Sequence, residues 1–291
     1  MKTKFYSILL LSVLLYTCKT ENNKTVTPVI EDAPTSIEEN STTDESIEKE
    51  PEVISTPKIN NFIEKEGITI SPIEHGTMVL EYNGTNIYVD PVGGKDAFNK
   101  HKAPDFIIIT DIHGDHLDVK TLEAITTPNT VIIGPKAVKE KLPEVLQKNY
   151  NVIFNGLSRS FSTSKMDVDI EAIAMYNLRE EALKFHPKER GNGYVLTLNN
   201  IRIYISGDTE DIFEMRQLKD IDIAFVCMNL PYTMTVESAA SAVLQFAPKQ
   251  VYPYHYRGTE GYSDVNRFKE IVNNGNKNIS HSPATPCSTR A

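Results

Sequence analysis

The sequence is poor in cysteine and in positive charge. Three Cys among 291 residues are too few for a disulfide-dense scaffold. The formal net charge of −9 argues against nucleic acid as the main partner, because phosphate binding needs clustered Lys and Arg. Apolar residues are not scarce: they make up 40% of the chain, which excludes global disorder. The length suits one large domain or two small ones.

The negative charge is concentrated near the N-terminus. Residues 21–52 hold ten acidic residues against two basic ones, so the rest of the chain is only mildly acidic. From residue 19 to about 58, the chain is rich in Thr, Glu, Asn, Ser and Pro and shows no period of 2 or 3.6. Such a segment buries too little apolar surface to offset the entropy of ordering. We therefore expect 19–58 to be a disordered acidic tether and 59–279 to be the folded domain.

The first residues have the pattern of a secretory signal. Lys2 and Lys4 precede an apolar run over 5–16, which is shorter than the roughly 20 residues that span a bilayer. The run ends in Leu-Tyr-Thr-Cys, which resembles a bacterial lipobox with Cys18 as the lipidated residue. We expect a signal peptide over 1–18 and an extracytoplasmic chain that is lipid-anchored to a bacterial membrane, on its periplasmic or cell-surface side. The alternative is an ordinary cleaved signal in which Cys18 is incidental.

Beyond residue 66, segments with strand and helix patterns alternate, which is typical of an α/β domain. Asn83 and Gly84 lie between two strand-like segments, 78–82 and 86–89, and predict a hairpin. The continuous apolar run 106–109 is typical of a buried strand. Further strands are expected over 131–133, 168–175, 194–198, 201–205, 221–226 and 251–254. Helices are expected over 119–125 and 236–246, and 280–291 is expected to be an irregular tail.

Potential metal ligands follow several of these strands. The segment Thr-Asp-Ile-His-Gly-Asp-His at 110–116 holds four within six residues, Asp111, His113, Asp115 and His116. Others follow later strands, namely His186, Asp208 and His255. Sites in α/β folds lie at such strand ends, and imidazole with carboxylate suits zinc, manganese or ferrous iron. Taken singly, Asp208 could also be a helix N-cap and His255 a packed core histidine.

This pattern resembles the metallo-β-lactamase superfamily, whose first motif is Thr-His-x-His-x-Asp-His. A His after the middle strands, a Gly-Asp-Thr and a final His follow in the family's order over about residues 66–275. Tyr-Asn, Phe-His-Pro-Lys, Gly-Tyr-Val and Ser-Gly-Asp-Thr, with Val-Asp-Pro upstream, are most similar to the branch that contains ascorbate-phosphate lactonase and lipid phosphodiesterase relatives. The resemblance implies a four-layer αββα sandwich.

The resemblance also implies two divalent metal ions, with zinc as the expected metal. Asp111, His113 and His186 would hold one ion. Asp115, His116 and His255 would hold the other, and Asp208 would bridge the two. A hydroxide between the ions would attack the substrate, which makes Asp115 and Asp208 the expected catalytic carboxylates. Asp111 stands where the family has His, and this harder ligand shifts the preference towards manganese or iron.

Five further residues are expected to support the ligands or to contact the substrate: His75, Asp90, Asn177, Lys188 and Arg190. The two basic residues would face an anionic substrate, or alternatively belong to a solvated face. Two motifs of calcineurin-like phosphoesterases also match, Asp-x-His at 111–113 and Gly-Asp-x-x-Asp at 207–211, but the later motifs of that family are absent from the sequence.

The sequence therefore predicts a metal-dependent hydrolase that acts on an ester, lactone or phosphodiester bond of a small molecule. The alternative is a non-catalytic metal- or ligand-binding lipoprotein on the same fold, and Asp111 is the residue that favours it.

Overall fold

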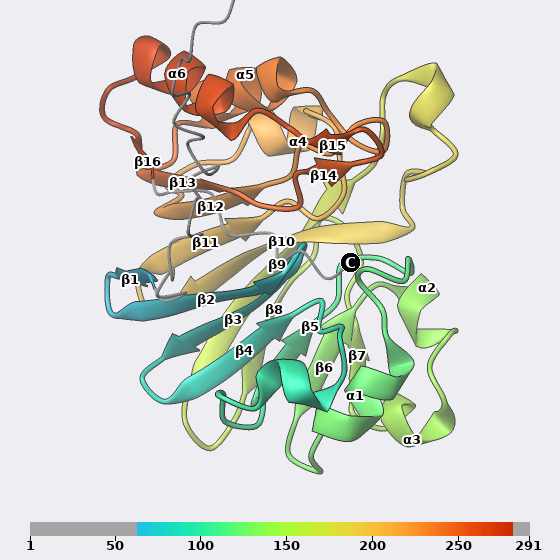
Figure 1. Cartoon of the computed structure of the whole chain (residues 1–291). Coiled ribbons are helices and arrows are strands. Elements are labelled where there is room, and N and C mark those ends of the chain that lie inside the picture. The colour runs from blue at the N-terminus through green and yellow to red at the C-terminus, as the bar shows by residue number, and fades with distance from the viewer. Residues whose placement is uncertain (1–62, 282–291) are drawn as a thin grey trace, which may run out of the picture. The chain divides into compact units, whose positions relative to one another are not determined.

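The computed structural model describes residues 63–281, which form two seven-stranded sheets packed face to face (Figure 1). The strands of the first sheet follow chain order: β1 (Ile63–Lys65), β2 (Ile68–Glu74), β3 (Thr77–Tyr82), β4 (Thr85–Val89), β5 (Phe106–Ile108), β6 (Val131–Gly134) and β7 (Tyr150–Val152). Strands β1 to β4 pair antiparallel, and β4 to β7 pair parallel. The carboxyl ends of β4 and β5 therefore lie at one edge of the sheet.

The second sheet has the order β16-β13-β12-β11-β10-β9-β8. Its strands are β8 (Ser158–Ser162), β9 (Asp167–Met175), β10 (Gly191–Leu198), β11 (Ile201–Ile205), β12 (Ile223–Val226), β13 (Gln250–Pro253) and β16 (Ser280–His281). Strands β8 to β11 pair antiparallel, and β11, β12, β13 and β16 pair parallel. A separate ribbon joins β14 (Arg257–Gly258) to β15 (Gly261–Tyr262).

Helices cover the outer face of each sheet (Figure 1). The first sheet carries η1 (Lys95–Phe98), α1 (Val119–Ile125), α2 (Lys136–Lys139) and α3 (Glu144–Gln147). The second carries α4 (Phe213–Arg216), α5 (Val236–Phe246) and α6 (Val265–Gly275), and η2 (Glu180–Ala182) lies in the loop after β9. The layers run helix, sheet, sheet, helix, so the expected αββα sandwich is confirmed.

Two buried clusters hold the layers together, and β5 contributes to both. Phe106 and Ile108 point into the core that includes the facing sides of the two sheets. Ile107 points the other way and packs with Leu122 of α1 and Leu146 of α3. Alternate residues of a strand face opposite sides, so a strand covered on both sides needs a continuous apolar run. This explains why the residues directly before the Asp/His segment are all aliphatic or aromatic.

The predicted hairpin is confirmed at Asn83 and Gly84. Strands β3 and β4 pair with Tyr82 opposite Thr85, which leaves a two-residue loop. Asn83 and Gly84 have φ values of 49° and 74°, as a type I′ turn requires. The helices predicted over 119–125 and 236–246 are also found at those bounds, and Asp118 and Thr235 cap their N-termini.

The C-terminal segment differs from the expected irregular tail at its beginning. Ser280 and His281 form β16, which pairs parallel with Gln250 and Val251 at the edge of the second sheet. Two residues are too few to show a period, so the pattern could not reveal this strand. Residues 1–62, with Cys18, and 282–291 lie outside the described residues. Within the described part, no helix combines the length and apolarity that a membrane span requires.

Candidate metal centre

His and Asp side chains from five segments converge at one end of the two sheets. The segment after β5 supplies Asp111 to His116, and the β2–β3 turn supplies His75. Asp208 follows β11, and His255 follows β13. Because the carboxyl ends of parallel strands share an edge, residues far apart in sequence meet here. Every residue predicted as a ligand belongs to one of three groups of donor atoms, and His75 joins them.

His116, Asp208 and His255 form the most buried of these groups. Asp208 Oδ2 lies 3.4 Å from His116 Nε2, and Asp208 Oδ1 lies 3.3 Å from His255 Nδ1. Among the described residues, His116 Nε2, Asp208 Oδ1 and both ring nitrogens of His255 make no hydrogen bond. Such orphaned buried atoms are costly, and a divalent cation would satisfy His116 Nε2, Asp208 Oδ1 and one ring nitrogen of His255. The three residues therefore fit a metal ion.

Asp115 and His75 extend this group towards solvent. Asp115 Oδ2 lies 3.3 Å from His255 Nε2 and 3.6 Å from His75 Nε2, and its Oδ1 lies 3.8 Å from His116 Nε2. The Asp115 side chain is 42% exposed, whereas the others are buried. The ring of His75 lies 3.7 Å from that of His255, centroid to centroid. His75 was expected in a supporting role, and the structure places it among the potential ligands.

The buried carboxylate of Asp90 orients His116. Asp90 Oδ2 lies 2.8 Å from His116 Nδ1. Thr110 donates its backbone N–H to Asp90 Oδ1 at 2.7 Å and its hydroxyl to Oδ2 at 2.6 Å. This holds Nε2 of His116 towards Asp208. Burial alone would lower the pKa of His116, but the carboxylates of Asp208, Asp90 and Asp115 outweigh it and raise the pKa well above its usual value.

Three non-glycine residues at the centre adopt a backbone conformation that normally favours glycine. His75, Asp90 and His255 have φ values of 49°, 43° and 46°, in the left-handed region. Each such residue costs free energy of order 1–3 kcal/mol, which the surrounding fold must offset. Gly76 permits the close contact between the β2–β3 turn and His255, since a Cβ there would lie 2.7 Å from His255 Cδ2.

Asp111, His113 and His186 form the remaining group. Asp111 Oδ2 lies 3.0 Å from His113 Nδ1 and 3.9 Å from His186 Nε2. His186 Nε2 also lies 3.3 Å from Asp208 Oδ2. Asp208, a member of the buried group, therefore contacts this group as well. Burial alone would raise the pKa of Asp111, but hydrogen bonds from His113 and Arg190 outweigh it and lower the pKa to about 2.

Asn177 supports the loop that carries His186. Its side-chain amide donates to the carbonyls of Ala182 at 2.9 Å and Tyr232 at 2.6 Å. The Tyr232 carbonyl is also 3.2 Å from His186 Nδ1, so the same carbonyl contacts both residues. Asn177 therefore connects the loop of His186 to the carbonyl of Tyr232.

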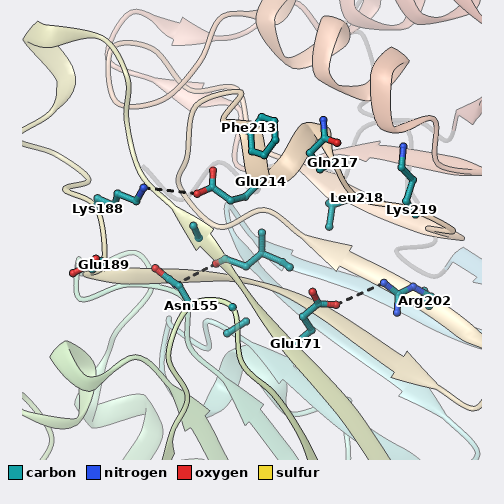
Figure 2. A pocket seen from close by; sticks show the side chains of 14 residues that line it. Asn155, Glu171, Lys188, Glu189, Arg202, Phe213, Glu214, Gln217, Leu218 and Lys219 are labelled. Carbon is teal, nitrogen blue, oxygen red and sulfur yellow. Dashed lines mark hydrogen bonds and ion pairs between the residues drawn. The ribbon is translucent and has the colours of Figure 1, made fainter.

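Lys188, which was expected to support the ligands or to contact the substrate, does not line the cavity at the centre. Figure 2 shows its side chain directed towards Glu214, with Nζ 3.8 Å from Glu214 Oε1. Nζ also lies 4.8 Å from the centroid of the Tyr176 ring. Lys188 lines a different cavity of about 580 Å³. An acidic and an aromatic partner on the outer side of the loop hold its cation away from the centre.

A cavity of about 430 Å³ opens onto the His and Asp cluster. Besides the cluster residues, it is lined by Phe185, Asn229, Tyr232, Arg257, Gly258 and Thr259. Sequence reasoning did not single out these residues: Phe185 belongs to the Phe-His-Pro-Lys motif but offers no ligand atom, and the others lie outside the family motifs, largely in irregular segments. Arg257 could have been noticed, since it stands only two residues after His255 and begins the β14–β15 ribbon.

Comparison with known proteins agrees with this geometry. The family model of the beta-lactamase superfamily domain matches residues 69–255. A crystal structure from Parabacteroides distasonis, described as that of a metal-dependent hydrolase, is 38% identical, covers 76% of this chain and 96% of its own, and has a TM-score of 0.65. A Flavobacterium johnsoniae protein named UPF0173 metal-dependent hydrolase is 29% identical over 68% of this chain and 88% of its own length.

A more distant structure shares the fold alone. The metallo-beta-lactamase fold protein YhfI from Bacillus subtilis is 11% identical, with a TM-score of 0.55 over 72% of this chain and 89% of its own. Together, the two-sheet sandwich and the His/Asp cluster at its edge define a metal-dependent hydrolase of the metallo-β-lactamase fold. The chain belongs to the beta-lactamase superfamily.

Proposed function

We propose that this hydrolase cleaves an ester, lactone or phosphodiester bond in a small anionic molecule. The observation that carries the metal requirement is the buried group of His116, Asp208 and His255, whose facing atoms lack hydrogen-bond partners. A divalent ion held there would polarise the scissile bond and lower the pKa of a water molecule. Asp115, exposed at the edge of the same group, lies where it can position that water. The range of bonds follows from the resemblance of the motifs.

Arg257 supports an anionic substrate. It lines the cavity beside Asp115 and His75, and no carboxylate of the described residues lies within 4.0 Å of its guanidinium nitrogens. A cation without an acidic partner in a cavity of this size is suited to bind a carboxylate or phosphate group. A divalent ion would offset the negative charges of Asp115 and Asp208, so these carboxylates would not repel an anion.

The donor set limits the choice of metal. Imidazole and carboxylate together suit zinc, manganese and ferrous iron. Zinc is the first choice for a group with two imidazoles, and manganese or iron are the alternatives that Asp111 introduces. A second ion, which the resemblance implies, would need Asp111 as a ligand.

The test is hydrolysis by the purified full chain in detergent, with chelator and then with Zn²⁺, Mn²⁺ or Fe²⁺ added back. The probes are bis-p-nitrophenyl phosphate, p-nitrophenyl acetate and a panel of anionic and neutral lactones. We expect one class to be hydrolysed only with metal and Asp208→Asn to be inactive. Lys188→Met, in the other cavity, is the control and should keep wild-type activity. If no metal supports hydrolysis of any probe class, the proposed bond types are wrong.

We further propose that Cys18 anchors the chain to a membrane by a lipid. The support is the basic start, the apolar run and the Leu-Tyr-Thr-Cys sequence. Radiolabelled palmitate should label the wild type and Cys287→Ser equally and should not label Cys18→Ser. Equal labelling of all three would contradict the anchor.

A further inference from the structure

Arg190 makes a bidentate ion pair with Asp111. Its Nε donates to Asp111 Oδ1 at 3.0 Å, and its Nη2 donates to Asp111 Oδ2 at 2.7 Å. Nη2 also donates to the backbone carbonyl of Phe185. The Asp111 side chain is completely buried, and that of Arg190 is 18% exposed. The guanidinium is therefore fixed in one position by three acceptors, and both carboxylate oxygens of Asp111 are already occupied.

The same guanidinium also reaches His113. Arg190 Nη2 lies 3.3 Å from His113 Nε2. The other nitrogen, Nδ1, lies 3.0 Å from Asp111 Oδ2, and a carboxylate can only accept, so Nδ1 carries the proton. Nε2 is then unprotonated and lies within 3.3 Å of the guanidinium. Both carboxylate oxygens of Asp111 and both ring nitrogens of His113 therefore already have neighbours within this group.

The distribution of charged side chains also distinguishes the group around His113 from the group around His116. Around His113, the negative charge of Asp111 is balanced by the positive charge of Arg190. Around His116, three carboxylates are present, those of Asp90, Asp115 and Asp208, and no Lys or Arg of the described residues pairs with any of them. A divalent cation is attracted to the second group and repelled by the fixed guanidinium beside the first.

From this geometry we infer that the centre holds one divalent ion, and that the guanidinium of Arg190 takes the place of the second. The ion belongs to His116, Asp208 and His255, with Asp115 at the edge. His186 lies 3.3 Å from Asp208 and is available to that same ion. Asp111 and His113 are not ligands; together with Arg190 they form a fixed, hydrogen-bonded wall of the cavity, which His113 lines. The inference rests on the proposed metal dependence.

Metal counting tests the inference without an assay of activity. The full chain is stripped with chelator, dialysed against Zn²⁺ or Mn²⁺, and analysed for bound metal per chain by mass spectrometry. We expect one ion in the wild type, one in Asp111→Ala and none in His255→Ala. Two ions in the wild type, with one lost in Asp111→Ala, would overturn the inference and leave the proposed function intact. No ion in the wild type would contradict the metal dependence itself.

A gain of binding distinguishes the role of Arg190 from a general loss of folding. Asp111→His combined with Arg190→Ala restores the family's Thr-His-x-His pattern and removes the guanidinium. This double variant should bind two ions, and with Mn²⁺ its electron paramagnetic resonance spectrum should show two coupled ions. Asp111→His alone keeps Arg190 and should still bind one, with the spectrum of an isolated Mn²⁺ ion. If the double variant also binds one, the exclusion of the second ion does not come from Arg190.

Discussion

The carboxylate of Asp90 decides which nitrogen of His116 faces the proposed metal. It holds Nδ1 at 2.8 Å and leaves Nε2 directed at Asp208. Asp90→Asn keeps the shape but replaces an anionic acceptor by an amide, so the ring loses its fixed orientation and part of its basicity. We expect metal affinity to fall roughly 10–100-fold. Competition with a chelating dye measures this.

The matched control is Asp118→Asn, which removes a carboxylate that caps α1 and does not contact the centre. Asn caps a helix about as well as Asp, so stability should change little and metal affinity should stay unchanged. Equal affinities for Asp90→Asn and the wild type would show that Asp90 does not act through His116.

Cys227, which is not a proposed ligand, gives stability a further dependence on pH. It is fully buried directly after β12, and burial raises the pKa of its thiol from 9.0 to about 12. Above pH 9, the unfolded chain releases this proton and the folded chain retains it, so stability falls as the pH rises. The slope from this one thiol is about 1.4 kcal/mol per pH unit between pH 9 and 12.

Cys227→Ala lacks this proton and isolates its contribution. The wild type and the variant should differ most in free energy of unfolding below pH 9. The advantage of the wild type should shrink between pH 9 and 11, as measured by urea unfolding at a series of pH values. A constant difference across that range would mean that the folded chain ionises Cys227 normally.

Residue types at strand ends predicted the ligand cluster but not the direction of every side chain. The positions of His116, Asp208 and His255 follow from motif order, because the fold brings their strands to one edge. Lys188 could not be placed, since its direction depends on Glu214, which is 26 residues away in the chain. The pairing of Arg190 with Asp111 has the same origin: the sequence shows both residues but not that their side chains meet.

At the scale of elements, the turn between β2 and β3 adjusts the position of His255. The β2–β3 pairing shifts register between Pro72 and Glu74, and the turn then presents His75 next to His255. In Gly76→Ala, the new Cβ would collide with the His255 ring at 2.7 Å. A displaced ring should reduce metal-dependent activity roughly 100-fold, as misplacement by about 1 Å does elsewhere.

Gly114→Ala is the control, because a Cβ at Gly114 meets no atom within 4 Å although the residue lies in the ligand-rich segment after β5. It should keep activity close to that of the wild type. Hydrolysis rates and metal content are measured on both variants. If Gly76→Ala retains full activity, the turn yields easily and does not position His255.

Elements with a long or strongly apolar pattern were predictable, and short or exposed ones were not. The bounds of helices α1 and α5 were predicted correctly, because the hydrophobic periodicity and the N-cap residues indicate the same helix. Strand β8 was missed, since Phe161 is its only buried side chain among polar neighbours. The β14–β15 ribbon consists of two-residue strands, which show no period. That ribbon carries Arg257 to the cavity, so the least predictable element supplies part of the cavity lining.

At the scale of the whole molecule, the proposed metal lies between the two sheets and should hold them together. The β2–β3 turn and the segment after β5 come from the first sheet, whereas Asp208 and His255 follow strands of the second. An ion bound by His116, Asp208 and His255 binds only the folded chain, because the unfolded chain does not bring these residues together. At a free metal concentration 100 times Kd, it should add about 2.7 kcal/mol to the stability.

For a domain of this size, that gain raises Tm by about 5–11 °C. We expect Zn²⁺ or Mn²⁺ to produce this shift in chelator-treated wild type, as measured by calorimetry. His255→Ala should show no shift, because it lacks a ligand from the second sheet. Arg190→Lys should show the full shift, since the guanidinium is not needed to hold the ion between the sheets. If the metal raised Tm equally in His255→Ala and the wild type, the ion would be bound elsewhere, and the two sheets would be joined by their apolar core alone.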